Sequence, residues 1–193
     1  VILYKRNDPD LRFNLVQNEE TTLYDICVRT YANYKASARH YGGEDSEEES
    51  FVCTENIYLA VPNTAQYRKR DSISLKELQK TNFIGLYGSK QLRSIFNEYC
   101  ERIGFKTHIT FESDNALAVK DAIASGIGVG FWPEFSWGRV NNRRIRLLKI
   151  TDAEFKRDIV ITLRKNKQDN SRSERFYQFL TGLLRRASSR RRG

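Results

Sequence analysis

The sequence predicts an α/β fold built around a mostly parallel β-sheet with helices on its faces. The buried-looking strand 83–87 runs through Gly88–Ser89 into a helix whose apolar residues recur up to Ile103. The same strand–loop–helix order follows at once in residues 107–126. The chain has 193 residues, 39% of them hydrophobic, which is enough to bury a sizeable core. Strands that alternate with helices in this way favour parallel pairing.

The first 50 residues give a weaker pattern. Residues 8–18 open with a Pro-Asp turn and then alternate apolar and polar side chains over Leu11–Leu15, as a half-buried strand does. Asn18 is a plausible N-cap, followed by acids, so a helix is expected to begin in 19–34. Residues 35–50 are small, charged and glycine-containing, which indicates a loop.

The rest of the chain has clearer signals. Pro62 ends a strand, Gly104 and Gly126 stop helices, and the last helix has strong amphipathic spacing. The expected elements are strand 55–62, a short helix around Leu75 and Leu78, strand 83–87, a helix ending near Ile103, strand 107–111, helix 116–126, strands 127–132, 145–150 and 158–165, and helix 173–186.

Composition excludes several classes of protein. No apolar run approaches the roughly 20 residues of a membrane span and no leader opens the chain, so we expect a soluble, cytoplasmic protein. Cys27, Cys53 and Cys100 are widely spaced and odd in number, which favours reduced, inert thiols. With only His40 and His108, and no metal-binding spacing, we expect no metal and no cofactor.

The formal charge of +9 raises nucleic acid as a partner, but its distribution weakens that hypothesis. Five arginines fall in residues 185–193, whereas residues 44–50 form a compact acidic block. Without those five arginines, +9 becomes +4, an ordinary value for a domain. The tail is a solvated terminus, a segment foreign to the domain or an electrostatic arm, and the sequence leaves these three open.

Two places offer a ligand site at the carboxyl ends of strands, where helix N-termini present unpaired N–H groups. One is Tyr87–Ser89 and the other is Glu112–Asn115. Ser89 and Ser113 could each cap a helix and also donate a hydroxyl hydrogen bond to a carboxylate.

Enzyme and nucleotide-binding readings fare poorly. Gly126, Gly128 and Gly130 lie between a helix and the next strand, the reverse of the dinucleotide-binding order, so we expect a helix stop followed by close packing. No GxSxG motif is present, and neither histidine has a recognisable nucleophilic partner. Asp114 is the one candidate acid, but a helix N-terminus favours its charged form, so we expect no enzyme.

Several segments together resemble the effector-binding domain of LysR-type transcriptional regulators. They are DPDLRFNLV, NIYLAVPNTAQY, ISLKELQKTNFIGL and LRSIFNEYCERIGFKTHITFESDNALAVKDAIASGIGVGFWPE, in that order. The resemblance covers residues 8–17 and 56–184, and SGIGVGFWPE is its most specific piece.

The resemblance implies two Rossmann-like lobes of periplasmic-binding-protein type 2 architecture, joined by crossing strands near 60–62 and 130–133. Lobe I would be residues 1–62 plus 132–193 and lobe II residues 63–131. Lobe I would lack the family's first strand, carry an atypical block at 27–50 and end in a disordered basic tail at 185–193.

The implied function is sensing of a small effector in the cleft between lobes, in a homodimer or tetramer. The resemblance places Tyr87, Gly88, Ser89, Ser113, Asp114, Phe131, Trp132 and Pro133 along that cleft. Hydroxyls, helix N-termini and aromatic rings favour a small organic anion. Because side chains alternate along a strand, we expect only one of Phe131 and Trp132 to face it.

DNA binding is not carried over, because the family's winged helix-turn-helix is not recognisable in these residues. DNA would be contacted only through such a domain. The alternative reading is a type 2 solute-binding protein of a transport system, which a signal peptide or a lipid-anchored cysteine would favour.

Overall fold

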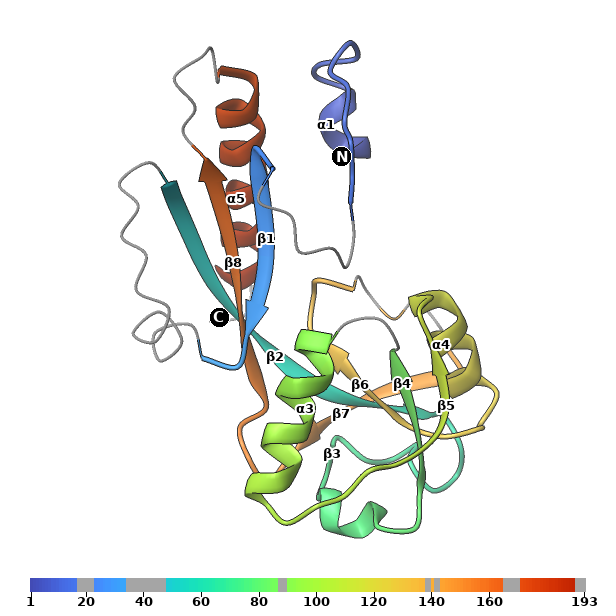
Figure 1. Cartoon of the computed structure of the whole chain (residues 1–193). Coiled ribbons are helices and arrows are strands. Elements are labelled where there is room, and N and C mark those ends of the chain that lie inside the picture. Colours follow the sequence, from blue (N-terminus) through green and yellow to red (C-terminus); the bar gives the residue numbers. More distant parts are fainter. Residues whose placement is uncertain are drawn as a thin grey trace. The chain divides into compact units, whose positions relative to one another are not determined.

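The computed structural model describes residues 1–16, 23–33, 48–86, 90–137, 140, 143–164 and 171–189, with only the backbone for 90–92. The chain forms two compact units. Unit 1 combines Val1–Thr54 with Asp158–Gly193, and unit 2 is Glu55–Arg157. Two long strands, β2 (Glu48–Pro62) and β8 (Lys156–Arg164), run through both (Figure 1).

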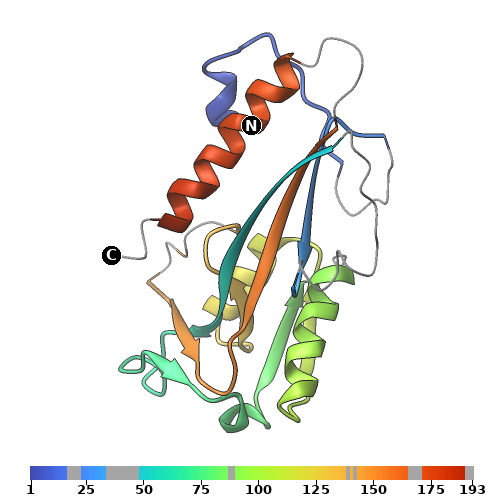
Figure 2. The ribbon, with the colours of Figure 1, turned by 90° about the vertical axis from the view of Figure 1, so that its left-hand side faces the viewer.

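Unit 1 is a three-stranded layer with one long helix. β8 lies between β1 (Ile26–Tyr31) and the first half of β2, and its pairing with β1 is antiparallel. Ser50 and Thr162 share a hydrogen bond of 3.2 Å between their hydroxyl oxygens, which ties β2 to β8. The helix α5 (Ser171–Ser189) runs along this layer in Figure 2 and buries Tyr177.

The strand predicted in residues 8–18 is wrong for its described part, because 8–16 have no regular structure. Phe13 instead packs against Phe176 of α5, with ring centroids 4.8 Å apart, and against Tyr4 of α1 (Ile2–Lys5). An irregular segment that buries one side against a helix shows the same alternation as a strand. Residues 17–22 lie outside the described residues.

The helix predicted for 19–34 is also wrong where the structure describes it, since Ile26–Tyr31 is a strand. β-Branched and aromatic side chains dominate this segment, and pairing with β8 supplies the hydrogen bonds that sequence alone does not show. The last helix is predicted correctly but extends to Ser189, so residues 185–189 are helical rather than part of a disordered tail. Arg185 lies over the ring of Phe51 at 5.1 Å.

Unit 2 holds most of the predicted elements close to their expected bounds. Its further strands and helices are β3 (Ser72–Ile73), the 3-10 helix η1 (Leu75–Leu78), β4 (Asn82–Leu86), α3 (Lys90–Arg102), β5 (His108–Ser113), α4 (Ala116–Ala124), β6 (Gly130–Pro133) and β7 (Ile145–Ile150).

The prediction of a mostly parallel sheet holds only for part of the fold. β4 and β5 pair in parallel, as do β3 and β7, and Phe83 bridges Val129 in parallel. β2 pairs antiparallel with β6 and with β7. Helix α3 returns the chain between β4 and β5, which allows parallel pairing, whereas the described residues of 130–164 contain no helix.

The glycines after α4 have the roles expected from the sequence. Gly126 has φ +80°. Its N–H donates to the carbonyl of Ile123, and the N–H of Ile127 donates to the carbonyl of Ala122. These two hydrogen bonds form a Schellman motif at the end of the helix. At Gly128 an added Cβ would lie 2.5 Å from the carbonyl oxygen of Asn82. The strand after α4 can therefore approach β4 only because this residue has no side chain.

Candidate ligand site in the second unit

The first candidate feature is the shared carboxyl edge of β4 and β5. Their register places Leu86 opposite Ser113, so both strands end at the same edge of the sheet. Ser113 and Asp114 therefore lie at the edge where β4 also ends. Tyr87, Gly88 and Ser89, which follow β4 in the sequence, lie outside the described residues.

Ser113 does not cap α4, contrary to one reading of the sequence. The N-cap is Asn115, whose side-chain oxygen accepts a hydrogen bond of 2.8 Å from the N–H of Leu117. Ser113 Oγ accepts a bond of 3.1 Å from the N–H of Asn115, which shapes the turn before the helix. Among the described residues its hydroxyl hydrogen has no acceptor, and Asp114 is exposed.

Phe131 belongs to an aromatic stack inside unit 2. Its side chain is 7% exposed. Its ring centroid lies 4.6 Å from that of Phe96 on α3 and 5.4 Å from that of Phe155, with which it stacks at 16°. Phe83 on β4 completes the group at 5.7 Å. Phe131 therefore joins β6 to the α3 side of the sheet.

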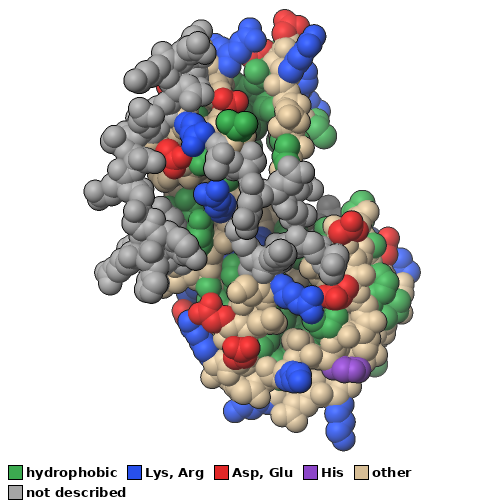
Figure 3. All heavy atoms as spheres, in the orientation of Figure 1, with side chains coloured by type: hydrophobic (Ala, Val, Ile, Leu, Met, Phe, Trp, Pro, Cys, Tyr) green, Lys and Arg blue, Asp and Glu red, His purple; other side chains and the backbone are tan. Residues whose placement is uncertain are grey.

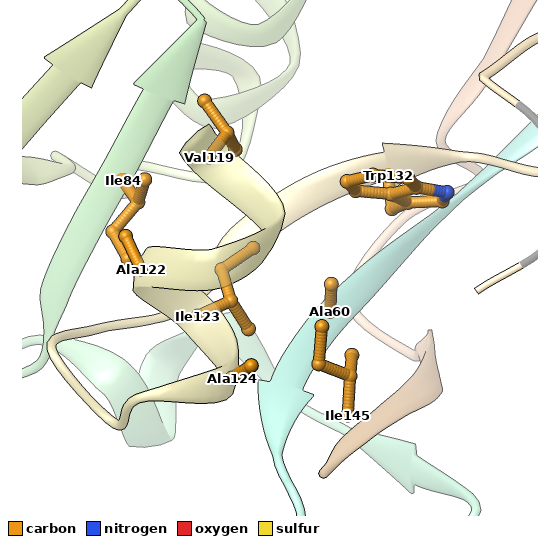
Figure 4. Close-up of a cluster of buried hydrophobic side chains, with 8 residues drawn as sticks. All are labelled: Ala60, Ile84, Val119, Ala122, Ile123, Ala124, Trp132 and Ile145. Carbon is orange, nitrogen blue, oxygen red and sulfur yellow. The ribbon is translucent and has the colours of Figure 1, made fainter. Parts of the chain in front are cut away.

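Trp132 lies on the other side of β6, in an apolar cluster against α4 (Figure 4). It is 3% exposed, and its ring meets that of Trp137 edge to face at 5.1 Å. Its indole N–H is buried without an acceptor among the described residues. Pro133 is buried and pairs with Ile57 of β2. Phe131 and Trp132 therefore pack on opposite sides of β6, Phe131 in the aromatic stack with Phe96 and Trp132 in the cluster against α4.

A pocket opens between α3 and the β4–β5 pair. Its floor is apolar and includes Phe83, Phe96 and Phe131, while Arg93, Asn97 and Glu112 add polar groups. Its cavity volume is about 40 Å³, which holds one or two water molecules rather than an organic ligand. A ligand would therefore have to displace side chains at its rim.

The rim of this pocket carries an ion pair that the sequence analysis did not single out. Arg93 on α3 lies 3.3 Å from Glu112 on β5, and their side chains are 50% and 29% exposed. Glu112 folds over β4, where a Cβ on Gly85 would meet its carboxylate at 3.2 Å. A pair this exposed contributes little stability, so Arg93 can exchange its partner for another anion at small cost.

A second charged group is fully buried where β2, β6 and β8 meet. Glu55 and Arg157 have side-chain exposures of 0% and 5%, and Glu55 Oε1 accepts a hydrogen bond of 2.7 Å from Arg157 Nε. Ser136 donates to Glu55 through both its hydroxyl, at 2.7 Å, and its N–H, at 3.0 Å. The signal for both residues was alternation: Glu55 lies on the same face of β2 as the buried Ile57, and Arg157 on the same face of β8 as the buried Ile159.

Several other expectations concern reactive groups. Cys27, Cys53 and Cys100 are not joined in disulfides. Burial raises the pKa of Cys100 to about 12, which makes it a poor nucleophile. His108 is exposed. None of the helices in the described part of the chain is long and apolar enough to cross a membrane.

Charge is mixed on the face drawn in Figure 3. Basic and acidic side chains alternate over its described surface instead of gathering into a patch of one sign. A broad electrostatic surface for nucleic acid is not evident on this face. Residues 190–193, which hold three of the five tail arginines, lie outside the described residues.

The family model of the LysR substrate binding domain matches residues 4–185. The chain belongs to this family.

Two curated proteins of Bacillus subtilis (strain 168) resemble this LysR substrate binding domain. The transcriptional dual regulator GltC is 26% identical over 127 residues, which cover 66% of this chain and 42% of GltC. The uncharacterized HTH-type transcriptional regulator YybE is 26% identical over 185 residues, which cover 92% of this chain and 60% of YybE. The chain therefore spans about half the length of these relatives.

Solved structures share its fold. The effector binding domain of QuiR in complex with shikimate matches 98% of this chain and 78% of its own, with TM-score 0.63 and 16% identity. The CcmR regulatory domain of Synechocystis PCC6803 in complex with 2-PG matches 94% and 77%, with TM-score 0.62 and 15% identity. The predicted α/β fold of periplasmic-binding-protein type 2 architecture is thereby confirmed.

Proposed function

We propose that this chain is the effector-sensing domain of a LysR-type transcriptional regulator, and that it responds to a small organic anion. The observation that carries the proposal is the arrangement at the carboxyl edge of β4 and β5. There the exchangeable guanidinium of Arg93 lines a pocket with aromatic side chains. Ser113, the last residue of β5, lies at the same edge of the sheet directly after Glu112.

Arg93 supplies the anion preference. Its planar guanidinium can bind a carboxylate or phosphate through two N–H groups, and its present partner, Glu112, is a carboxylate at 3.3 Å. A ligand carboxylate would take the place of the Glu112 carboxylate and would place its apolar part toward Phe96 and Phe131. QuiR and CcmR, the relatives of similar fold, are bound to shikimate and 2-PG.

The lobe organisation predicted from the sequence is part of this proposal. Tyr87, Gly88, Ser89, Ser113, Asp114, Phe131, Trp132 and Pro133 stay predictions as effector-lining residues. So do the lobe boundaries at 1–62 plus 132–193 and 63–131. Binding would shift the populations of lobe arrangements, and a winged helix-turn-helix outside these residues would pass the change to DNA. Such a regulator would act in the cytoplasm as a homodimer or tetramer.

A thermal-shift screen of small carboxylates and phosphates, with shikimate in the panel, tests the proposal. A ligand that binds only the folded state at about 100 times its Kd stabilises it by about 2.7 kcal/mol. For a chain of this size the Tm should rise by about 5–10 °C. If no anion of the panel raises the Tm, sensing of a small organic anion is contradicted.

Two variants locate the site. Arg93→Gln and Ser113→Ala should each reduce the shift, because the first removes the guanidinium that lines the pocket and the second removes the hydroxyl at the end of β5, beside Glu112. Arg102→Gln is the matched control, since Arg102 lies on the same helix and pairs with Glu98 instead. A hit whose shift is unchanged in Arg93→Gln and Ser113→Ala would place the ligand elsewhere.

The alternative function, a solute-binding protein of a transport system, is not favoured by the curated relatives, which are transcriptional regulators rather than enzymes or transporters. We also propose that the domain has no catalytic activity of its own. Incubation of the purified protein with each hit, followed by mass spectrometry of the compound, should return the compound unchanged.

A further inference from the structure

The buried Glu55–Arg157 pair holds more than the two strands that carry it. The Glu55 carboxylate accepts four hydrogen bonds, of which only one comes from Arg157. The other three come from the segment that follows β6: the N–H groups of Phe135 and Ser136 and the Ser136 hydroxyl. Arg157 Nη2 also donates to Ser136 Oγ at 2.7 Å.

The residue after this anchored segment is Trp137. Its side chain lines the pocket together with Phe131 and Arg93, and its ring packs edge to face on Trp132. The segment leaves β6 at Pro133, and residues 134–136 form no strand or helix. The position of Trp137 therefore depends on residues 135 and 136, whose N–H groups both donate to Glu55. Asn56 holds Glu134, the first residue of the same segment.

The Glu55–Arg157 pair is charged although it lies in the core. Two buried charged groups are costly to desolvate, and apolar residues of similar size often stabilise a core equally well. An apolar side chain at position 55 could not accept hydrogen bonds from the two consecutive N–H groups. The pair thus fixes the direction of one segment rather than adding apolar packing.

From these contacts we infer that Glu55 and Arg157 are positioning residues that hold Trp137 as a wall of the ligand pocket. The significance of the pocket rests on the proposed function, but the positioning itself does not depend on any ligand. Trp137 contributes its indole ring to the pocket wall. Glu55 and Arg157 hold the preceding residue, Ser136, by hydrogen bonds and so determine where Trp137 lies. Sequence reasoning assigned none of these four residues to the site.

Intrinsic fluorescence reads this position directly, because Trp132 and Trp137 are the only two tryptophans of the chain. In a Trp132→Phe background the emission comes from Trp137 alone. Acrylamide quenching should then rise about twofold on Ser136→Ala, as the loosened segment exposes the indole more often. Glu55→Gln should have a larger effect, and Ser136→Thr, which keeps the hydroxyl, should restore the quenching of the parent.

The matched control is Ser74→Ala in the same background. Ser74 Oγ donates to Asp152 at 2.8 Å, which is a serine–carboxylate bond of the same kind elsewhere in unit 2. Its loss should leave Trp137 quenching unchanged. Far-UV circular dichroism checks that each variant is folded, and Ser136→Ala keeps the test decisive if Glu55→Gln does not fold.

Three results would overturn the inference. One is unchanged quenching in a folded Ser136→Ala variant. Another is a Ser136→Thr variant that behaves like Ser136→Ala, and the third is an equal rise in Ser74→Ala, which would indicate general loosening. Because no ligand is added, a failed metabolite screen would leave this measurement intact, and the two failures are distinguishable.

Discussion

Replacing Gly128 with alanine tests the account of how the strand after α4 joins β4. The added Cβ would lie 2.5 Å from the carbonyl oxygen of Asn82 and 3.0 Å from its carbonyl carbon. Both are backbone atoms of β4 and cannot rotate away, so one of the two strands must shift. That shift threatens the bonds from Val129 N to Asn82 O, at 2.9 Å, and from Ile84 N to Val129 O, at 2.8 Å.

The expected cost follows from these contacts. Overpacking of a well-packed core costs about 1–3 kcal/mol. Two weakened hydrogen bonds add about 0.5–1.5 kcal/mol each. Gly128→Ala should therefore lower the free energy of unfolding by about 2–6 kcal/mol, measured by urea denaturation followed by circular dichroism.

Gly126→Ala is the matched control, two residues earlier. Gly126 has φ +80° but open space within 4 Å of an added Cβ, so the substitution causes backbone strain without a clash. Its cost should be about 1–2 kcal/mol. A Gly128→Ala variant as stable as the parent, or more stable than Gly126→Ala, would refute the close-packing argument.

Two further predictions concern titration. The bidentate contact with Arg70 holds the pKa of Glu77 down to about 2, below its ordinary 4.5. The ion pair therefore stabilises the fold above pH 4.5, and this stabilisation is lost as the pH falls toward 2. At neutral pH the Glu77→Gln variant should be less stable than the parent, by at most about 1 kcal/mol because the pair is exposed. This difference in stability should vanish in acid. Burial raises the pKa of Cys100 from 9.0 to about 12, so its thiolate fraction should be about a thousandfold below that of a free thiol. Labelling with a thiol reagent, followed by peptide mapping, should find Cys100 unmodified in the native protein and modified in urea, and rapid native labelling would contradict its burial.

Unit 2 was the more predictable half of the chain for a local reason. Strand 83–87, the helix that ends before Gly104 and the helix that ends before Gly126 each carry their own periodicity and stop signal within about a dozen residues. The structure places them within a few residues of their expected bounds. In these segments short-range preference and tertiary packing agree.

Unit 1 was less predictable because its signals depend on distant partners. Ile26–Tyr31 becomes a strand by pairing with residues 158–163, more than a hundred positions later. The alternating residues near Phe13 pack on α5 instead of joining a sheet. In both cases the deciding interaction is absent from the local sequence.

The candidate site shows the same division. The sequence by itself determined the strand ends that carry Ser113 and Asp114, the glycines that admit the strand after α4, and the two aromatic residues of β6, because each follows from local chain geometry. Only the tertiary structure decided that Arg93 and Glu112 form the pocket rim and that Glu55 and Arg157 anchor the segment before Trp137. Ion pairs between distant elements depend on where the packed backbone places each side chain, and no spacing along the chain encodes that position.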